Sequence, residues 1–186
     1  RGHWSFCSAR KYFGVPDGAY LYSPISIARQ FERNTAIEMD YLVNKVRGRQ
    51  SLAFRQYQQY EKSLDCSIRS ISLTSEEILE RLDYEFVIKA RMKNFNFLRN
   101  ELKDLNLLSI SSEINEGFCY PLILERDIPK QMFHANAIFI PTLWPDVLKR
   151  KEPGFSTAQE LTRKIIPIPV DHRYRPDDLR KVTRFI

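Results

Sequence analysis

The sequence predicts a mixed fold of the α/β type, or an α+β domain, in which a small mixed or antiparallel sheet is covered by helices. Segments with helical and strand periodicity alternate through the second half of the chain, as they do in such folds. Apolar residues make up 43% and charged residues 28% of the 186 residues, which is ordinary for a globular protein with a core. No apolar run approaches the roughly 20 residues that a membrane-spanning helix needs.

The first third of the chain is expected to form a strand and then two helices. The segment VPDG at 15–18 carries Pro and Gly at favoured positions of a tight turn, and the strand GAYLYS at 18–23 follows it. Apolar and aromatic residues then recur at intervals of three and four residues from 34 to 64, with a break near Gly48. This pattern predicts two helices that are separated at the glycine.

Two more helices are expected in the middle of the chain. The segment LTSEEILERLD at 73–83 places Thr74 or Ser75 ahead of acidic residues, which is a capping pattern for a helix N-terminus. A long amphipathic helix is expected next, from about Tyr84 to Leu105. The residues expected to form its buried stripe are Phe86, Ala90, Phe97, Leu98, Leu102 and Leu105.

The last part of the chain is expected to alternate between strands and helices. The prolines of IIPIPV exclude that segment from the centre of a sheet and place it at an edge. Asp127 is expected to cap the short helix that contains Phe133. The expected elements are a strand at 117–125, a helix at 127–136, a strand at 137–145, a helix at 155–164, the edge strand at 165–170 and a helix at 175–186.

Charge and cysteine usage exclude several classes of function. The formal net charge is +6, but basic residues alternate with acidic ones and form no tract, so solvated helix faces are favoured over a nucleic-acid surface. Three widely spaced cysteines and three scattered histidines indicate neither a disulfide framework nor a metal site, and they fit a reducing cytoplasm. The opening RGHWSF lacks the apolar segment of a secretory signal.

The segment SFCSARK places Lys11 close to hydroxyl groups and to a second cation. A lysine amine attacks carbonyl groups only when it is deprotonated, and dehydration or a neighbouring cation favours that form. Ser8 lies three residues ahead of Lys11, Ser5 lies farther back, and Arg10 is adjacent. An amine beside hydroxyl and backbone N–H groups suits pyridoxal 5'-phosphate, which needs both a lysine and a phosphate site. The same spacing arises often by chance, so by itself it leaves Lys11 open to interpretation as an ordinary surface lysine.

Three segments in order resemble one enzyme family. SARKYFGVPDGAYL at 8–21 is similar to the cofactor-lysine segment of fold-type I pyridoxal-phosphate-dependent aminotransferases, in particular the DegT/StrS sugar-aminotransferase group. KARMKNFNFLRNEL at 89–102 resembles the long helix that begins the small domain of that family. ANAIFIPTLWP at 135–145, followed by IIPIPVDHRYRPDDLRKV at 165–182, resembles its strand, loop and final helix. The resemblance covers nearly the whole chain, though only loosely between 23 and 83.

The resemblance implies roles for the residues of SFCSARK. Lys11 would be the catalytic residue that bonds to pyridoxal 5'-phosphate and moves a proton between carbons. Ser8 and Ser5 would bind the cofactor phosphate, and Arg10 would either add charge there or remain solvated. No metal is implied.

The resemblance also divides the chain into parts. Residues 1–30 would end the large cofactor-binding domain, 31–82 would form linking helices, and 83–186 would form the C-terminal small domain. Trp144 and the run 172–174 align with small-domain loops near the active-site mouth, but loop packing and solvated charge are the favoured explanation and no catalytic role is assigned to them.

The implied activity is transfer of an amino group from an amino donor to a keto-sugar, nucleotide-linked, for polysaccharide biosynthesis in a cytoplasmic homodimer. Neither nucleic acid nor a membrane is an expected partner. In the family, a preceding domain supplies an acid for the pyridine nitrogen and an aromatic ring over the cofactor. We therefore expect this chain to be the C-terminal part of such an enzyme and inactive in isolation. The alternative is a catalytically inactive dimerisation module whose apolar surface comes from the helices at 42–60.

Overall fold

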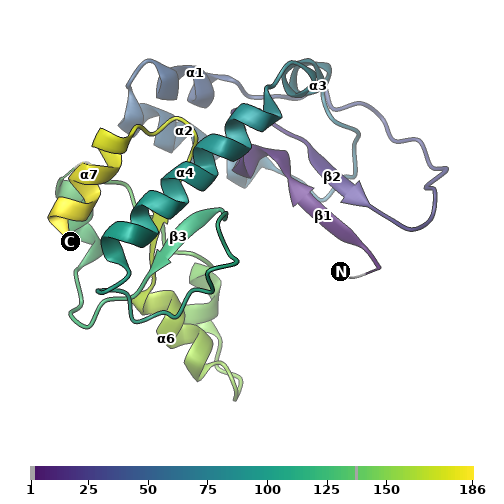
Figure 1. Ribbon diagram of the computed structural model, residues 1–186. Helices are drawn as coiled ribbons and strands as arrows, with labels where there is room; N and C mark the ends of the chain where they lie inside the picture. Colours follow the sequence, from purple (N-terminus) through teal and green to yellow (C-terminus); the bar gives the residue numbers. More distant parts are fainter. Residues whose placement is uncertain (1–2, 137) are drawn as a thin grey trace. The chain divides into compact units, whose positions relative to one another are not determined.

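The structure, a computed structural model, describes residues 3–136 and 138–186. The chain divides into two compact units, Arg1–Leu82 and Asp83–Ile186, and each unit contains helices and one two-stranded antiparallel sheet (Figure 1). The expected mixture of helices with a small antiparallel sheet is therefore confirmed. Among the described residues, no helix is both long enough and apolar enough to cross a membrane.

The first unit contains a β-hairpin and three α-helices. The hairpin register runs from Ser5 opposite Tyr22 to Ser8 opposite Ala19. Its elements are β1 (Ser5–Ser8), the short 3-10 helix η1 (Ala9–Lys11), β2 (Ala19–Tyr22), α1 (Asp40–Val46), α2 (Gln50–Ser63) and α3 (Leu73–Glu80). The strand expected after the VPDG turn and the two helices separated near Gly48 are confirmed. Gly48 separates them because its φ of 74° lies in the left-handed region that glycine adopts without strain.

The cap of α3 differs from the expected one. Ser72 occupies the N-cap position with extended backbone, and its hydroxyl accepts a hydrogen bond from the Ser75 N–H at 3.2 Å. Thr74 and Ser75 already lie inside the first turn, so neither is the cap. The expected position of the cap was wrong because the capping residue precedes the first helical residue. From there its side chain reaches the unpaired N–H groups of the first turn.

The core of the first unit is small. One cluster of buried apolar residues consists of Ala9 in η1, Val15 in the turn and Leu79 in α3, while Tyr41, Ala53 and Tyr60 are buried in α1 and α2. The partly buried residues that pack against the Val15 cluster are Phe13, Ile71, Ile78 and Leu82. This cluster joins the segment between β1 and β2 to α3, while most residues of the two strands themselves are exposed to solvent.

The second unit contains a longer series of elements. They are α4 (Tyr84–Leu102), β3 (Cys119–Leu122), α5 (Lys130–Ala135), the 3-10 helix η2 (Pro145–Lys149), α6 (Ser156–Lys164), β4 (Ile166–Pro169) and α7 (Pro176–Phe185). Strand β4 pairs with β3 in antiparallel register, which leaves each strand with one open edge. The proline-rich segment is therefore an edge strand, as expected.

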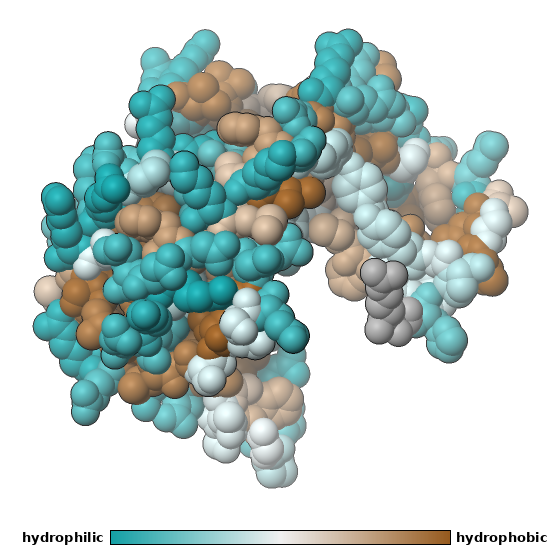
Figure 2. Space-filling model, viewed as in Figure 1, coloured by the Kyte–Doolittle hydropathy of each residue, from teal (hydrophilic) through white to brown (hydrophobic). Residues whose placement is uncertain are grey.

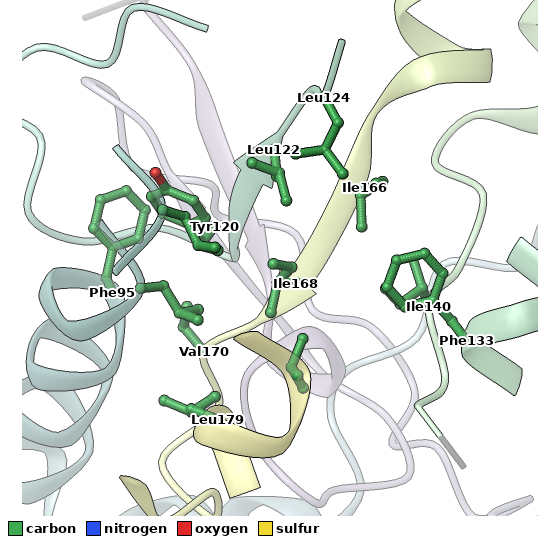
Figure 3. Packing of buried hydrophobic residues seen from close by; sticks show 13 residues of the cluster. Phe95, Tyr120, Leu122, Leu124, Phe133, Ile140, Ile166, Ile168, Val170 and Leu179 are labelled. Atoms are coloured by element: carbon green, nitrogen blue, oxygen red, sulfur yellow. The ribbon is translucent and has the colours of Figure 1, made fainter. Parts of the chain in front are cut away.

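The core of the second unit covers one face of its sheet. Tyr120 lies opposite Ile168, and Leu122 lies opposite Ile166, so these four side chains share a face because strand side chains alternate with a period of two. Helices α4, α5 and α7 contribute the residues packed on that face, including Phe95, Phe133 and Leu179 (Figure 3). Helices α4 and α7 lie side by side (Figure 1).

The buried stripe of α4 was predicted correctly in part: Leu98 and Leu102 are buried and Phe97 packs against the core, but Phe86 and Leu105 are not part of it. Phe86 is 58% exposed, and Leu105 is 52% exposed and lies beyond the end of the helix. Two polar residues occupy positions in the stripe instead. Arg91 donates to the carbonyls of Gly117 and Phe118 at 2.9 and 3.1 Å. The buried residues are Val87, Arg91, Asn94, Phe95, Leu98 and Leu102, and hydrophobicity alone does not show that the two polar ones are inside.

Two further expectations fail in the second unit. Residues 138–144 form a loop rather than a strand, and the first residue of that expected strand, Ala137, lies outside the described residues. Prolines at 141 and 145 remove two of the N–H donors that a strand there would need. Helix α5 begins at Lys130 with Pro129 as its N-cap residue, so Asp127 lies too early to cap it.

We expect Phe133→Ala to lower the free energy of unfolding of the second unit by about 3–5 kcal/mol, because it removes a fully buried ring and leaves a cavity. The Phe133 ring packs edge-on against Phe185 with centroids 4.8 Å apart. Phe139, which is 62% exposed, gives the matched control, and Phe139→Ala should change stability by no more than about 0.5 kcal/mol. Urea unfolding of the two variants measures both values, and equal losses would contradict this packing.

Candidate functional site

The segment that carries Lys11 is a hairpin connection closed by backbone hydrogen bonds. The Ala9 N–H donates to the Gly18 carbonyl at 3.1 Å, which joins the end of β1 to the start of β2. The N–H groups of Tyr12 and Phe13 then donate to the Ala9 carbonyl at 3.0 and 2.9 Å, which folds η1 back on itself. Lys11 is the last residue of η1, and its side chain is exposed to solvent.

Arg10 is directed towards helix α2. Its guanidinium pairs with the Glu61 carboxylate at 2.8 Å and lies 5.8 Å from the ring centroid of Tyr60. Tyr60 stacks on Tyr41, whose other neighbour is Tyr57. Burial lowers the pKa of Arg10, but the hydrogen bond and charge of Glu61 raise this pKa more, so it lies above its ordinary value. The charge of Arg10 is therefore already compensated, and the residue ties the Lys11 segment to α2.

Asp17 is the most heavily bonded residue of the turn. Its Oδ1 accepts hydrogen bonds from the hydroxyls of Ser72, at 2.6 Å, and Ser75. Its Oδ2 accepts from the Asn34 side-chain amide at 2.8 Å and from the Ser72 N–H at 2.9 Å. Burial raises the pKa of the Asp17 carboxyl, but these hydrogen bonds lower it more, so the pKa lies below its ordinary value.

Three neighbours of Asp17 fix the rest of the turn. The Tyr60 hydroxyl donates to the Pro16 carbonyl at 3.1 Å, and Val15 is buried in the small core. Gly18 has a φ of 106°, and a Cβ at this position would lie 2.5 Å from Cδ1 of Ile71. The turn therefore presents Lys11 from a support that is anchored to both α2 and α3.

Ser8 and Ser5 differ in their surroundings. Ser8 is half-buried and precedes η1, but its hydroxyl makes no capping hydrogen bond to that helix. Ser5 is exposed at the far end of β1. Ser8, Arg10 and Lys11 are thus neighbours at one end of the hairpin, whereas Ser5 is three residues farther along the strand.

Two hollows of the surface lie away from these residues. One hollow of about 410 Å³ is lined by α3 and includes Thr74, Glu77 and Arg81. Another, of about 340 Å³, lies in the second unit beside Phe95 and Cys119. Neither includes Ser5, Ser8, Arg10 or Lys11. A dehydrated environment for the Lys11 amine, which the chemistry requires, is therefore not supplied by either hollow.

The loop at 171–174 has a structural explanation. The Asn94 side-chain amide donates to the carbonyls of Asp171 and Tyr174 at 2.9 and 3.3 Å. The Arg173 guanidinium makes two hydrogen bonds to the Asp171 carboxylate, at 2.7 and 2.9 Å. Burial raises the pKa of Asp171, but the hydrogen bonds and charge of Arg173 lower this pKa by more. The pKa of Asp171 therefore lies below its ordinary value. Trp144 is exposed with a positive φ of 48°, and no contact in the second unit gives it a chemical role.

Sequence reasoning missed Asp17 and Glu61 as anchors of the Lys11 segment. The VPDG motif marked Asp17 as a turn residue, and an Asp in a turn ordinarily bonds to nearby backbone. Its hydroxyl partners lie 55 and 58 positions away, so no local pattern could have identified them. Glu61, the partner of Arg10, lies 51 positions away and could not be identified from the sequence for the same reason.

No protein-family model, curated protein or solved structure matches the chain. Among the described residues, no group of three or more His, Cys, Asp or Glu side chains could hold a metal ion. The family and activity suggested by SARKYFGVPDGAYL therefore stay predictions.

We expect Gly18→Ala to destabilise the first unit by about 1–3 kcal/mol, because alanine adopts this positive φ only with strain and its Cβ would collide with Ile71. Gly14 in the same turn is the matched control, since a Cβ there meets no atom within 4 Å and its φ is not positive. Gly14→Ala should be neutral or slightly stabilising. Thermal unfolding compares the two variants, and an unstrained Gly18→Ala protein would contradict this turn geometry.

Proposed function

We propose that the chain is part of a pyridoxal-phosphate-dependent aminotransferase of the DegT/StrS-like, fold-type I class, and that Lys11 is its cofactor lysine. The observation that carries the proposal is the position of Lys11 at the end of a hairpin turn whose base is anchored by Asp17, Gly18 and Arg10. A reactive group needs such a rigid support, because its position relative to the substrate decides the rate. The substrate class, a nucleotide-linked keto-sugar with an amino donor, rests on the resemblance alone.

The described residues fit one part of the cofactor requirement. Lys11 offers an accessible primary amine, and Ser8, three residues ahead, has a hydroxyl that η1 does not use as a cap. When bound, the cofactor would supply an electron sink for a carbanion. Lys11 would anchor the cofactor and carry the proton, and Ser8 would bind an anionic oxygen. Arg10 would act through its ion pair with Glu61 by holding the turn, rather than by binding the phosphate.

In the proposed enzyme, the remainder of the cofactor site would come from the large domain that the family places before the cofactor lysine. Neither of the two hollows described above includes Lys11. The interpretation of the chain as a C-terminal part of the enzyme rests on the resemblance. The homodimer of the family would be a second source of residues for the site, since its active sites are shared between subunits.

A second candidate function, a catalytically inactive dimerisation module, is favoured by the exposed apolar residues of α1 and α2. Val46 is 88% exposed and Phe54 is 60% exposed, within the segment 42–60. Apolar residues also lie among the polar ones elsewhere on the surface (Figure 2). Scattered exposure of this kind is common in monomers, which is why we rank this function second.

We expect the full-length protein, supplied with pyridoxal 5'-phosphate and reduced with borohydride, to carry the reduced cofactor on Lys11. The amine condenses with the aldehyde and releases water, and borohydride then fixes the link as a secondary amine. Peptide mapping by mass spectrometry should find Lys11 labelled at least about tenfold more than the other lysines, because a cofactor site would hold the aldehyde next to this amine.

Two variants complete this experiment. Lys11→Ala should lose the selective label, whereas Lys62→Ala, which removes an exposed lysine at the end of α2, should retain it. Labelling spread evenly over the lysines would overturn the enzymatic proposal. If the same protein then forms a concentration-dependent dimer in sedimentation experiments, the dimerisation module becomes the better explanation.

A further inference from the structure

Asp17 accepts more hydrogen bonds than a turn requires. Four donors reach its two carboxylate oxygens, and all of them belong to residues between 17 and 58 positions away in the sequence. In addition, the Asp17 N–H donates to the Ser75 hydroxyl at 3.4 Å. An aspartate that served only to form the tight turn would bond to its immediate neighbours. These bonds instead fasten the turn to the N-terminus of α3 and to Asn34.

The Ser72 hydroxyl links this cluster to helix α3. It donates to Asp17 and accepts from the Ser75 N–H, so Asp17 fixes the orientation of the side chain that caps the helix. The same carboxylate thereby holds two partners, the helix start and the turn, in one arrangement. Hydrogen bonds that involve a charged group are stronger than neutral ones, which makes this junction stiff.

A short series of contacts connects Asp17 to Lys11. Gly18 follows Asp17, and its carbonyl accepts the Ala9 N–H. The Ala9 carbonyl in turn accepts the N–H groups of Tyr12 and Phe13 on the far side of Lys11. A displacement of the Asp17 side of the turn would therefore move the backbone on both sides of the lysine.

We propose that Asp17 is a positioning residue for Lys11: by binding Ser72, Ser75 and Asn34, it holds the hairpin turn so that the backbone that carries Lys11 stays in one place. This inference rests on the proposed role of Lys11 as the cofactor lysine. Asp17 itself touches no reacting atom. It acts through the turn, so its loss should affect the selectivity of Lys11 labelling more than the labelling of other lysines.

The chemistry of the donors predicts the order of two substitutions. Asp17→Ala removes every acceptor. Asp17→Asn keeps one oxygen, which can accept from the N–H groups of Asn34 and Ser72. These two groups can only donate, so they need that oxygen. Its amide nitrogen would face the hydroxyls of Ser72 and Ser75, and a hydroxyl can accept as well as donate. The asparagine variant should therefore retain part of the function.

The first measurement is borohydride trapping of pyridoxal 5'-phosphate on the full-length protein. We expect selective labelling of Lys11 to fall about tenfold in Asp17→Ala and less in Asp17→Asn, since small displacements of an oriented group cost large factors in rate. Asp65→Ala is the matched control, because Asp65 is an exposed carboxylate bonded only to its neighbours Ser67 and Arg69. It should leave the labelling unchanged.

The second measurement is hydrogen exchange of the amides of Tyr12 and Phe13, which needs no cofactor. Their protection should fall in Asp17→Ala, remain partly in Asp17→Asn and be unchanged in Asp65→Ala. Should Asp17→Ala fail to fold, the asparagine variant alone decides the outcome by the same two measurements.

The outcomes separate the two proposals. If the unsubstituted protein shows no selective label at Lys11, the proposed function fails, and a loss of amide protection in the Asp17 variants still supports the anchoring of the turn. If amide protection falls while Lys11 labelling is unchanged, Asp17 is a structural anchor only and the positioning role is overturned. Unchanged protection and unchanged labelling would overturn it as well.

Discussion

The structure of the first unit depends on one carboxylate. Asp17 joins the turn after Lys11 to the cap of α3, and its two oxygens receive hydroxyl and N–H donors from three residues that are distant in sequence. Because these donors favour the charged form, the pKa of Asp17 is lowered, and the contribution of the carboxylate to stability is complete above its ordinary pKa. That contribution is lost as the pH falls through the lowered value. Because the buried apolar cluster around Val15 has only three members, polar bonds take a share of the stabilisation that a larger cluster would otherwise provide.

The second unit is organised differently, around one apolar face of the sheet formed by β3 and β4. Helix α4 contributes both apolar and polar residues to the interior. Its Asn94 and Arg91 side chains donate hydrogen bonds to backbone carbonyls of two loops. The hydrogen bonds of Asn94 explain how the loop at 171–174 is fixed to α4. The unit therefore has a conventional core with fixed loops, while the reactive candidate of the chain lies in the unit with the smaller core.

The sequence was sufficient for the elements whose signals are local. The hairpin strand after VPDG, the break at Gly48 and the proline-rich edge strand were all predicted, because turn chemistry and periodicity act over a few residues. The prediction failed where distant partners decide the structure. Arg91 is buried because carbonyls 26 and 27 positions away accept its hydrogen bonds, and residues 138–144 form a loop that still places Ile140 in the core. For the candidate site, the sequence identified Lys11 and its neighbours, but not Asp17 or Glu61 as their anchors.

The most direct test of this account is the titration of the Asp17 carboxyl, followed through its side-chain carbon by NMR. Hydrogen bonds from Ser72, Ser75 and Asn34 require a midpoint below that of an ordinary aspartate, and replacement of Ser72 and Ser75 by alanine should move the midpoint upwards. A midpoint at or above the ordinary value would mean that the carboxylate lacks these donors. In that case the turn would not be held to α3, and the rigid support proposed for Lys11 would not exist.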